Sequence, residues 1–126
     1  MASPRFFTLE EANALLPQLE DLIGEILAVR QRILDHQSEL WPVLEKAGQN
    51  GGNAFASAIV FDFEKVRQNV QAIQALGVTL KDVNTGLVDF LSYRDGREIY
   101  LCWRYGEPQI SYWHELHTGF AGRQPI

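Results

Sequence analysis

The stretch LVDFLSYRDGREIYLCWRY, residues 87–105, decides the fold of the second half of the chain. Apolar residues recur at alternate positions on both sides of Asp95-Gly96, a dipeptide that favours the two-residue turn of a β-hairpin. The stretch therefore predicts two antiparallel strands, Leu87–Tyr93 and Arg97–Tyr105. Because side chains alternate between the two faces of a strand, the core face is expected to carry Val88, Phe90, Ile99, Leu101 and Trp103. A two-residue turn sets Asp89 directly opposite Cys102 on the other face, which also carries Glu98, Tyr100 and Arg104.

One further strand is expected after this hairpin. Tyr105-Gly106-Glu107-Pro108 is typical of a turn, and Ile110–Glu115 follows it as a third strand. The result is a three-stranded β-meander over residues 87–115, followed by an irregular tail over residues 116–126. The type of the second turn is open, so the sequence leaves open which face of the sheet His114 joins.

The first half of the chain has helical periodicity. Thr8-Leu9-Glu10-Glu11 is a capping box that starts a helix, and Pro17 predicts a kink in it. Helical spacing of apolar residues extends this kinked first helix over residues 8–47 and predicts a second helix over residues 54–76. The GQNGGN segment between them is short, which favours an antiparallel hairpin. The expected fold is α+β: one domain, residues 1–126, in which a long antiparallel helical hairpin packs with a small three-stranded antiparallel β-meander.

Two apolar stripes run side by side along the first helix. The first is a heptad seam of the coiled-coil type, with Leu15, Leu19, Leu22, Ile26, Val29, Ile33, His36, Leu40 and Val43. The second consists of Leu16, Ile23, Leu27, Leu34, Trp41 and Leu44. A face this wide is more than one partner helix needs. We therefore expect a homodimer or higher homo-oligomer formed through the first helix.

Composition limits the classes of partner. The 126 residues carry a net charge of −5, and the basic residues are scattered, so binding to nucleic acid or to an anionic membrane is not expected. Aromatic residues are dense in the meander and could stack on single-stranded nucleic acid, but covering a thin sheet explains them equally well. We expect no signal peptide, no membrane span and no disulfide, because the chain has one cysteine, Cys102. A soluble cytoplasmic protein is expected.

The segment YWHELHTGF, residues 112–120, superficially resembles the His-Glu-x-x-His motif of zinc hydrolases. The second imidazole, His117, comes one residue early, and a strand would direct His114 and His117 to opposite faces. This is therefore not a hydrolase signature. A looser metal site is an alternative, formed by His114, Glu115 and His117, or by another three of the five residues Asp89, Cys102, His114, Glu115 and His117 if the chain bends after Leu116. Apart from such a divalent metal, we expect no cofactor.

Several short motifs, in order, resemble a known family. They are Phe7-Thr8-Leu9-Glu10-Glu11-Ala12-Asn13, Leu15-Leu16-Pro17, Lys81-Asp82, Thr85–Phe90, Leu101-Cys102-Trp103-Arg104, Gly106-Glu107, Trp113-His114-Glu115 and Gly119–Arg123. Together they resemble the uncharacterised prokaryotic family catalogued as domain of unknown function 2203, over essentially the whole chain. The family carries no established activity, so the resemblance implies no reaction. It does single out a polar group of candidate ligand-binding residues: Asp89, Cys102, Glu107, His114, Glu115 and Arg123.

The resulting hypothesis for function is a non-catalytic, oligomeric interaction or regulatory domain, with no catalytic residue assigned. The alternative is a small metal- or ligand-binding protein, or an enzyme, with its site on the meander. In that case His114 and Glu115 act as acid, base or ligands, Asp89 orients them, and Arg123 clamps an anion. Cys102 is not expected to act as a nucleophile, because its partner Asp89 disfavours the thiolate.

Overall fold

The computed structural model describes residues 4–36 and 54–126, and within these residues the fold is α+β. The helices are α1 (Leu9–Ala14), α2 (Leu16–Asp35) and α4 (Ala54–Ala75), with a 3₁₀ turn η1 (Phe120–Gly122). The strands are β1 (Thr79–Asp82), β2 (Leu87–Arg94), β3 (Arg97–Arg104), β4 (Tyr112–Glu115) and β5 (Gln124–Pro125). They form one antiparallel sheet in the order β1-β2-β3-β4-β5. None of the helices within the described residues has the length and apolarity needed to cross a membrane.

The first helix is divided in two at Leu15. The Thr8 hydroxyl accepts from the backbone N–H of Glu11 at 3.1 Å, and the Glu11 carboxylate accepts from the backbone of Thr8 at 2.9 Å, so the capping box starts α1. Leu15 ends α1 and begins α2, and Pro17 lies in the first turn of α2, where its missing N–H costs no helical hydrogen bond. Residues 37–47 of the predicted helix, and the GQNGGN segment, lie outside the described residues.

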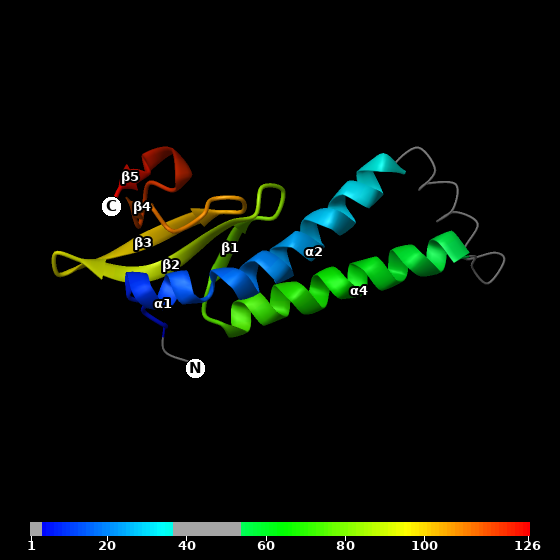
Figure 1. Ribbon diagram of the computed structural model, residues 1–126, viewed down its shortest axis with the longest axis horizontal. Coiled ribbons are helices and arrows are strands. Elements are labelled where there is room, and N and C mark those ends of the chain that lie inside the picture. Colours follow the sequence, from blue (N-terminus) through cyan, green and yellow to red (C-terminus); the bar gives the residue numbers. More distant parts are fainter. Residues whose placement is uncertain (1–3, 37–53) are drawn as a thin grey trace.

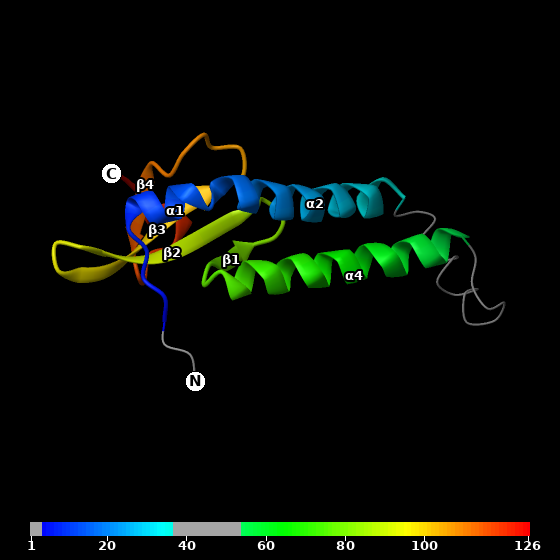
Figure 2. The ribbon, with the colours of Figure 1, turned by 60° about the horizontal axis from the view of Figure 1, so that its bottom comes forward.

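Helices α2 and α4 lie side by side and run in opposite directions (Figures 1 and 2). Buried Asn69 of α4 donates to the backbone carbonyl of Leu22 at 3.0 Å and to the Glu25 carboxylate at 2.8 Å, both on α2. Nearer the undescribed segment, Arg32 pairs with Asp62 at 2.8 Å. These polar contacts fix the alignment of the two helices along their apolar seam.

The sheet has five strands, so the predicted three-stranded meander was wrong in number. β1 adds to one edge, where Thr79 lies opposite Asp89, and β5 adds to the other, where Gln124 lies opposite Trp113. The sequence TLKD of β1 has little apolar alternation, and β5 has two residues, one of them a proline. Neither therefore has the pattern by which a half-buried strand is recognised.

The central hairpin has the register that its alternation predicts. β2 and β3 pair from Leu87 opposite Arg104 to Arg94 opposite Arg97, and Asp89 lies opposite Cys102. The core face of the sheet carries side chains that are at most 6% exposed, namely Val88, Phe90, Ile99, Leu101 and Trp103. Helices α1 and α2 cover this face, as Figure 2 shows.

The wide apolar face of α2 is largely covered by its own chain. Leu16, Leu19, Ile23, Ile26 and Val29 are buried between the sheet and α4. The close approach to the sheet depends on Gly86 (φ +72°), where a Cβ atom would lie 2.8 Å from Ile23 Cγ2 and 2.7 Å from Tyr105 Cβ. Leu16, Ile23 and Leu27 of the second stripe thus pack in the core, and over these turns the width of the apolar face does not require a second copy of the protein.

Candidate functional site

Three neighbouring strands bring polar side chains together on the face of the sheet that is turned away from the helices, here called the outer face. β2 supplies Asp89, β3 supplies Cys102 and β4 supplies His114, which lies opposite Tyr100 of β3. All three side chains are at most 2% exposed. In Figure 1 the C-terminal segment lies on the opposite side of the sheet from α1, and its Arg123 reaches Cys102. We call Asp89, Cys102 and His114 the outer-face cluster.

The His114 imidazole has a hydrogen-bond acceptor at each ring nitrogen. Nδ1 lies 2.7 Å from the backbone carbonyl oxygen of Glu115, and Nε2 lies 3.0 Å from Asp89 Oδ1. A carbonyl oxygen only accepts, so Nδ1 must carry a proton. A neutral imidazole with Nδ1 protonated has a lone pair at Nε2, which would face the carboxylate oxygen. A second proton, carried by Nε2 or by the Asp89 carboxyl group, is therefore needed to form the Nε2–Oδ1 hydrogen bond.

The thiol of Cys102 completes the cluster. One ligand atom from each of Asp89, Cys102 and His114 can be chosen so that all three lie within 4.8 Å of one another. Burial raises the pKa of the Cys102 thiol to about 11; the hydrogen bond from Arg123 opposes this effect, and the charge of Asp89 reinforces it. Cys102 is thus a protonated thiol at neutral pH and is not an activated nucleophile.

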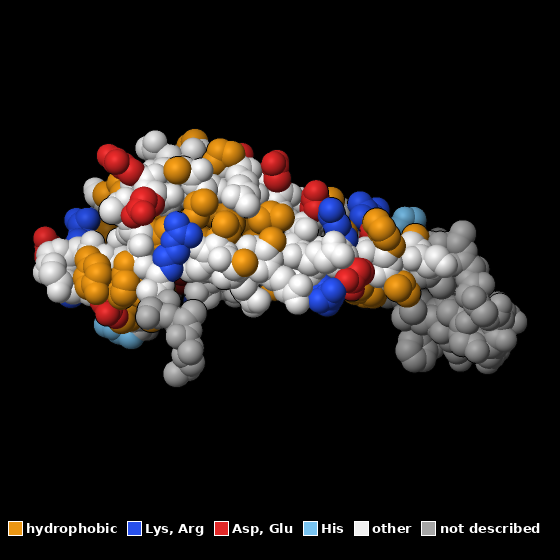
Figure 3. All heavy atoms as spheres, turned by 90° about the horizontal axis from the view of Figure 1, so that it is seen from below, with side chains coloured by type: hydrophobic (Ala, Val, Ile, Leu, Met, Phe, Trp, Pro, Cys, Tyr) orange, Lys and Arg blue, Asp and Glu red, His pale blue; other side chains and the backbone are white. Residues whose placement is uncertain are grey.

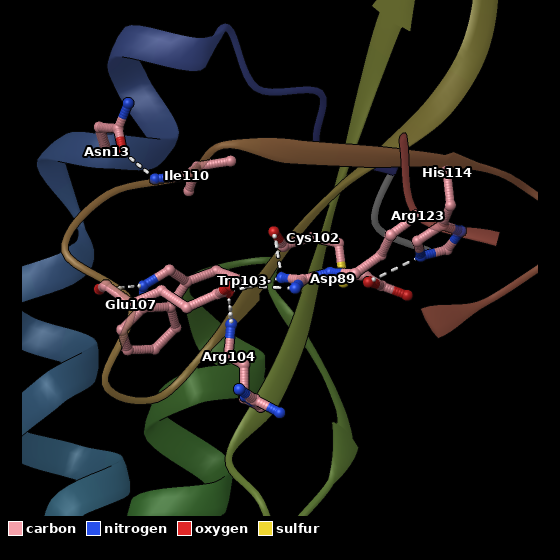
Figure 4. Close-up of polar contacts among 9 residues, drawn as sticks. All are labelled: Asn13, Asp89, Cys102, Trp103, Arg104, Glu107, Ile110, His114 and Arg123. Atoms are coloured by element: carbon pink, nitrogen blue, oxygen red, sulfur yellow. Dashed lines mark hydrogen bonds and ion pairs between the residues drawn. The ribbon is translucent and has the colours of Figure 1, made fainter. Parts of the chain in front are cut away.

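Arg123 joins the C-terminal segment to the outer face (Figure 4). Its Nε donates to Cys102 Sγ at 3.3 Å, and its Nη2 donates to the Cys102 carbonyl oxygen at 3.1 Å. Both of its terminal nitrogens also donate to the Glu107 carboxylate, in a bidentate pair. The guanidinium stacks on the rings of Tyr112 and Phe120, at 4.4 and 4.7 Å from their centroids. Each of the three guanidinium nitrogens of Arg123 therefore donates to a group of the protein itself.

Glu107 fixes the loop between β3 and β4. Its carboxylate accepts from the backbone N–H of Arg104 at 2.7 Å, and its carbonyl oxygen accepts from the Trp103 indole at 2.9 Å. Burial alone would raise the pKa of Glu107, but the hydrogen bonds from Arg123 and from the Arg104 backbone outweigh it and lower the pKa. For Arg123, burial acts to lower the pKa, and the bonds to Glu107 and Cys102 raise it. The charged forms of both groups are thus stabilised.

The structure separates the remaining predicted residues from the cluster. Glu115 lies opposite Ile99, on the core-facing side, and pairs with Arg97 at the edge of the sheet. His117 is exposed in the turn after β4. The set His114, Glu115 and His117 is therefore not brought together, whereas Asp89, Cys102 and His114 are.

Asn13 is a contributor that the sequence reasoning missed. Its Oδ1 accepts from the backbone N–H of Ile110 at 2.9 Å and so ties the β3–β4 loop to α1 (Figure 4). The two residues are 97 positions apart, and no local pattern links them. The only signal was its place in the opening motif that resembles the family.

The outer-face cluster does not open onto the hollow that lies beside the N-terminal segment. That hollow, of about 450 Å³, is on the core-facing side of the sheet and is lined by Phe7, Ile99 and Trp113, among others. None of the six candidate ligand-binding residues lines it. Because the three side chains of the cluster are at most 2% exposed, a ligand of the cluster would be enclosed by protein.

Comparison with known proteins gives a family and no activity. The model of a family described as an uncharacterised conserved protein, DUF2203, matches residues 5–126. No curated protein and no solved structure matches the chain. The family match spans α1, α2, α4 and all five strands, together with every residue of the outer-face cluster. The chain therefore belongs to the family of uncharacterised conserved proteins DUF2203.

Proposed function

We propose that this protein is a non-catalytic interaction domain that assembles with copies of itself through the end of its helical hairpin. The observation that supports this proposal is the exposure of large apolar side chains there. On α4, Val60, Phe61 and Phe63 are 66, 71 and 52% exposed, and on α2 Leu34 is 43% exposed. Isolated exposed apolar residues are ordinary, but exposed apolar side chains that line a groove, as Leu34 and Phe63 do, are typical of a contact surface.

An apolar groove lies beside these residues, between α2, α4 and the β1–β2 turn. Its volume is about 300 Å³, and its lining is mainly aliphatic and aromatic, with Ile26, Val29, Ile33, Leu34, Phe63, Val66 and Val83. Figure 3 shows apolar side chains on both helices towards this end of the hairpin. We call this groove, with the exposed Leu34 and Phe63 that line it, the hairpin surface. It offers both a hollow and exposed apolar side chains beside it, which a self-complementary contact needs.

The charges around the hairpin surface favour a second copy over a partner of opposite charge. A twofold contact brings the same patch of each subunit together, so a patch of one sign would repel itself. Here the charges are paired within the chain: Arg32 with Asp62, Lys65 with Glu25, and Arg67 with Glu64. Such pairs leave few charges to oppose self-association; of the residues that line the groove, Arg30 is the charged one, and its Nε donates to Asn84 Oδ1 at 2.8 Å.

The test is the mass of the protein in solution. We expect light scattering at micromolar concentration to give a dimer or a larger assembly. Phe63→Glu places a charge in the groove and should give a monomer, because an unpaired carboxylate in an apolar contact is costly. Leu116→Glu is the matched control: Leu116 is 47% exposed, similar to Phe63, but lies in the turn after β4. A wild-type monomer at several hundred micromolar would refute the proposal, as would an assembly unaffected by Phe63→Glu.

We also place the protein in the cytoplasm. Cys102 is the one cysteine of the chain and its thiol is buried, so stability does not depend on an oxidising compartment. Fractionation of cells that produce the protein would test this, and recovery in an extracytoplasmic fraction would contradict it.

A further inference from the structure

We propose that Asp89, Cys102 and His114 are a binding site for one divalent transition-metal ion of the zinc class. The three residues come from β2, β3 and β4, so rigid neighbouring strands fix their separation. Their ligand atoms already lie within 4.8 Å of one another. A thiolate, an imidazole and a carboxylate together suit zinc and its neighbours better than the hard ions Mg²⁺ and Ca²⁺, which prefer oxygen.

The orientation of His114 is that of a metal ligand. Its Nδ1–H donates to the Glu115 carbonyl oxygen, which leaves Nε2 to face Asp89. Histidines that bind metals usually have their second nitrogen held in this way, because the hydrogen bond selects the tautomer and fixes the ring. Tetrahedral zinc places its nitrogen and oxygen ligands about 3.3 Å apart, as follows from the usual bond lengths. The Nε2–Oδ1 distance of 3.0 Å needs to open only slightly.

Charge balance permits the exchange of protons for a metal ion. Without metal, the contact between His114 Nε2 and Asp89 Oδ1 needs one shared proton, and Cys102 is a thiol, so the three side chains sum to zero charge whichever of the two groups carries that proton. A divalent ion displaces the shared proton and the Sγ proton of Cys102, so two protons leave and the buried sum stays zero. The fold therefore gains no uncompensated buried charge on binding, which would otherwise be costly.

Arg123 suits the metal-bound state as well. Its Nε lies 3.3 Å from Cys102 Sγ and would donate to the thiolate, while Glu107 balances its charge. No other histidine, cysteine, aspartate or glutamate of the described part of the chain joins the group. Three protein ligands leave the fourth position of a tetrahedral ion for water or a small exogenous ligand.

The wild-type experiment uses Co²⁺ as a spectroscopic probe and Zn²⁺ as competitor. Protein freed of metal by a chelator is titrated with Co²⁺, both folded and during refolding from urea, because the site is enclosed. We expect one Co²⁺ per chain, visible bands of tetrahedral Co²⁺, a thiolate-to-cobalt charge-transfer band that Zn²⁺ abolishes, and release of two protons per ion. Absence of Co²⁺ binding in both arms, or binding without proton release, would overturn the proposal.

Variants identify the ligands. Cys102→Ser should abolish the charge-transfer band and weaken binding at least tenfold, and His114→Gln should weaken it similarly. His117→Gln is the matched control, since His117 is exposed and outside the cluster, and it should bind as the wild type does. If a variant fails to fold, the number of protons that the wild type releases per Co²⁺ ion tests the proposal instead: two protons support it, and none contradicts it. Retention of the band in Cys102→Ser, or its loss in His117→Gln, would show that the ion binds elsewhere.

Discussion

Removing the Arg123 guanidinium should destabilise the protein by about 3 kcal/mol. The pair with Glu107 is mostly buried, with side chains 12 and 19% exposed. Hydrogen bonds to charged partners contribute about 1.5 to 3 kcal/mol each in favourable cases, and solvent access lowers that range here. Arg123→Ala also loses the stacking on Tyr112 and Phe120, worth about 0.5 to 1 kcal/mol for each ring.

A double-mutant cycle separates the contribution of the Arg123–Glu107 pair from that of the other contacts of Arg123. Glu107→Gln keeps the shape and one acceptor oxygen, so it should cost about 1.5 kcal/mol. We expect a coupling energy between Arg123→Ala and Glu107→Gln of about 1 kcal/mol. The assay is urea unfolding at pH 7, followed by tryptophan fluorescence, with stability taken from the linear extrapolation.

The matched control is the exposed arginine–glutamate pair that joins β3 and β4. Arg97 and Glu115 are 58 and 26% exposed, so their coupling should be about 0.5 kcal/mol or less. A coupling for Arg123 and Glu107 no larger than for this exposed pair would refute the reasoning, because burial would then add nothing.

Three further perturbations have expected outcomes. Gly86→Ala should cost about 3 kcal/mol in urea unfolding, because a Cβ atom would clash with Ile23 and Tyr105 at a positive φ; a loss below about 1 kcal/mol would contradict the packing. Thr8→Ala should cost about 1 kcal/mol and Thr8→Ser much less, since only alanine removes the capping oxygen of α1. Folding lowers the pKa of Glu107 below the ordinary 4.5, so its contribution is complete above that value and is lost as pH falls through the folded pKa. The stability difference between wild type and Glu107→Gln should therefore shrink below about pH 4.5, and a difference that persists at pH 3 would count against the pair.

The central hairpin was predictable because its information is local. Asp95 and Gly96 both adopt positive φ, of 54° and 80°, which is what the two-residue turn requires. That turn fixed the register, and the register placed Asp89 opposite Cys102. Edge strands β1 and β5 escaped prediction because a short strand with a polar sequence is defined by its neighbour, not by its own periodicity.

The sequence predicted which residues form the candidate site, but it did not predict which face of the sheet His114 joins. The sequence proposed Asp89, Cys102 and His114, but the side of His114 depended on the loop between β3 and β4. Glu107, Trp103 and Asn13 set the shape of that loop through contacts that no local pattern reveals. The wide apolar face of α2 does contact more than one partner helix, as its width predicted, but over the buried turns the additional partner is the sheet of the same chain.

One end of the helical hairpin extends past the sheet, and this affects both its local opening and its tolerance of substitutions (Figures 1 and 2). There, each described helix packs on the other and not on a strand, so amides in that region can exchange with solvent without opening the strands. Substitutions at that end should then alter local order while the rest of the molecule keeps its shape. Substitutions at this end of the hairpin could therefore change the contact surface of the helices without disturbing the outer-face cluster.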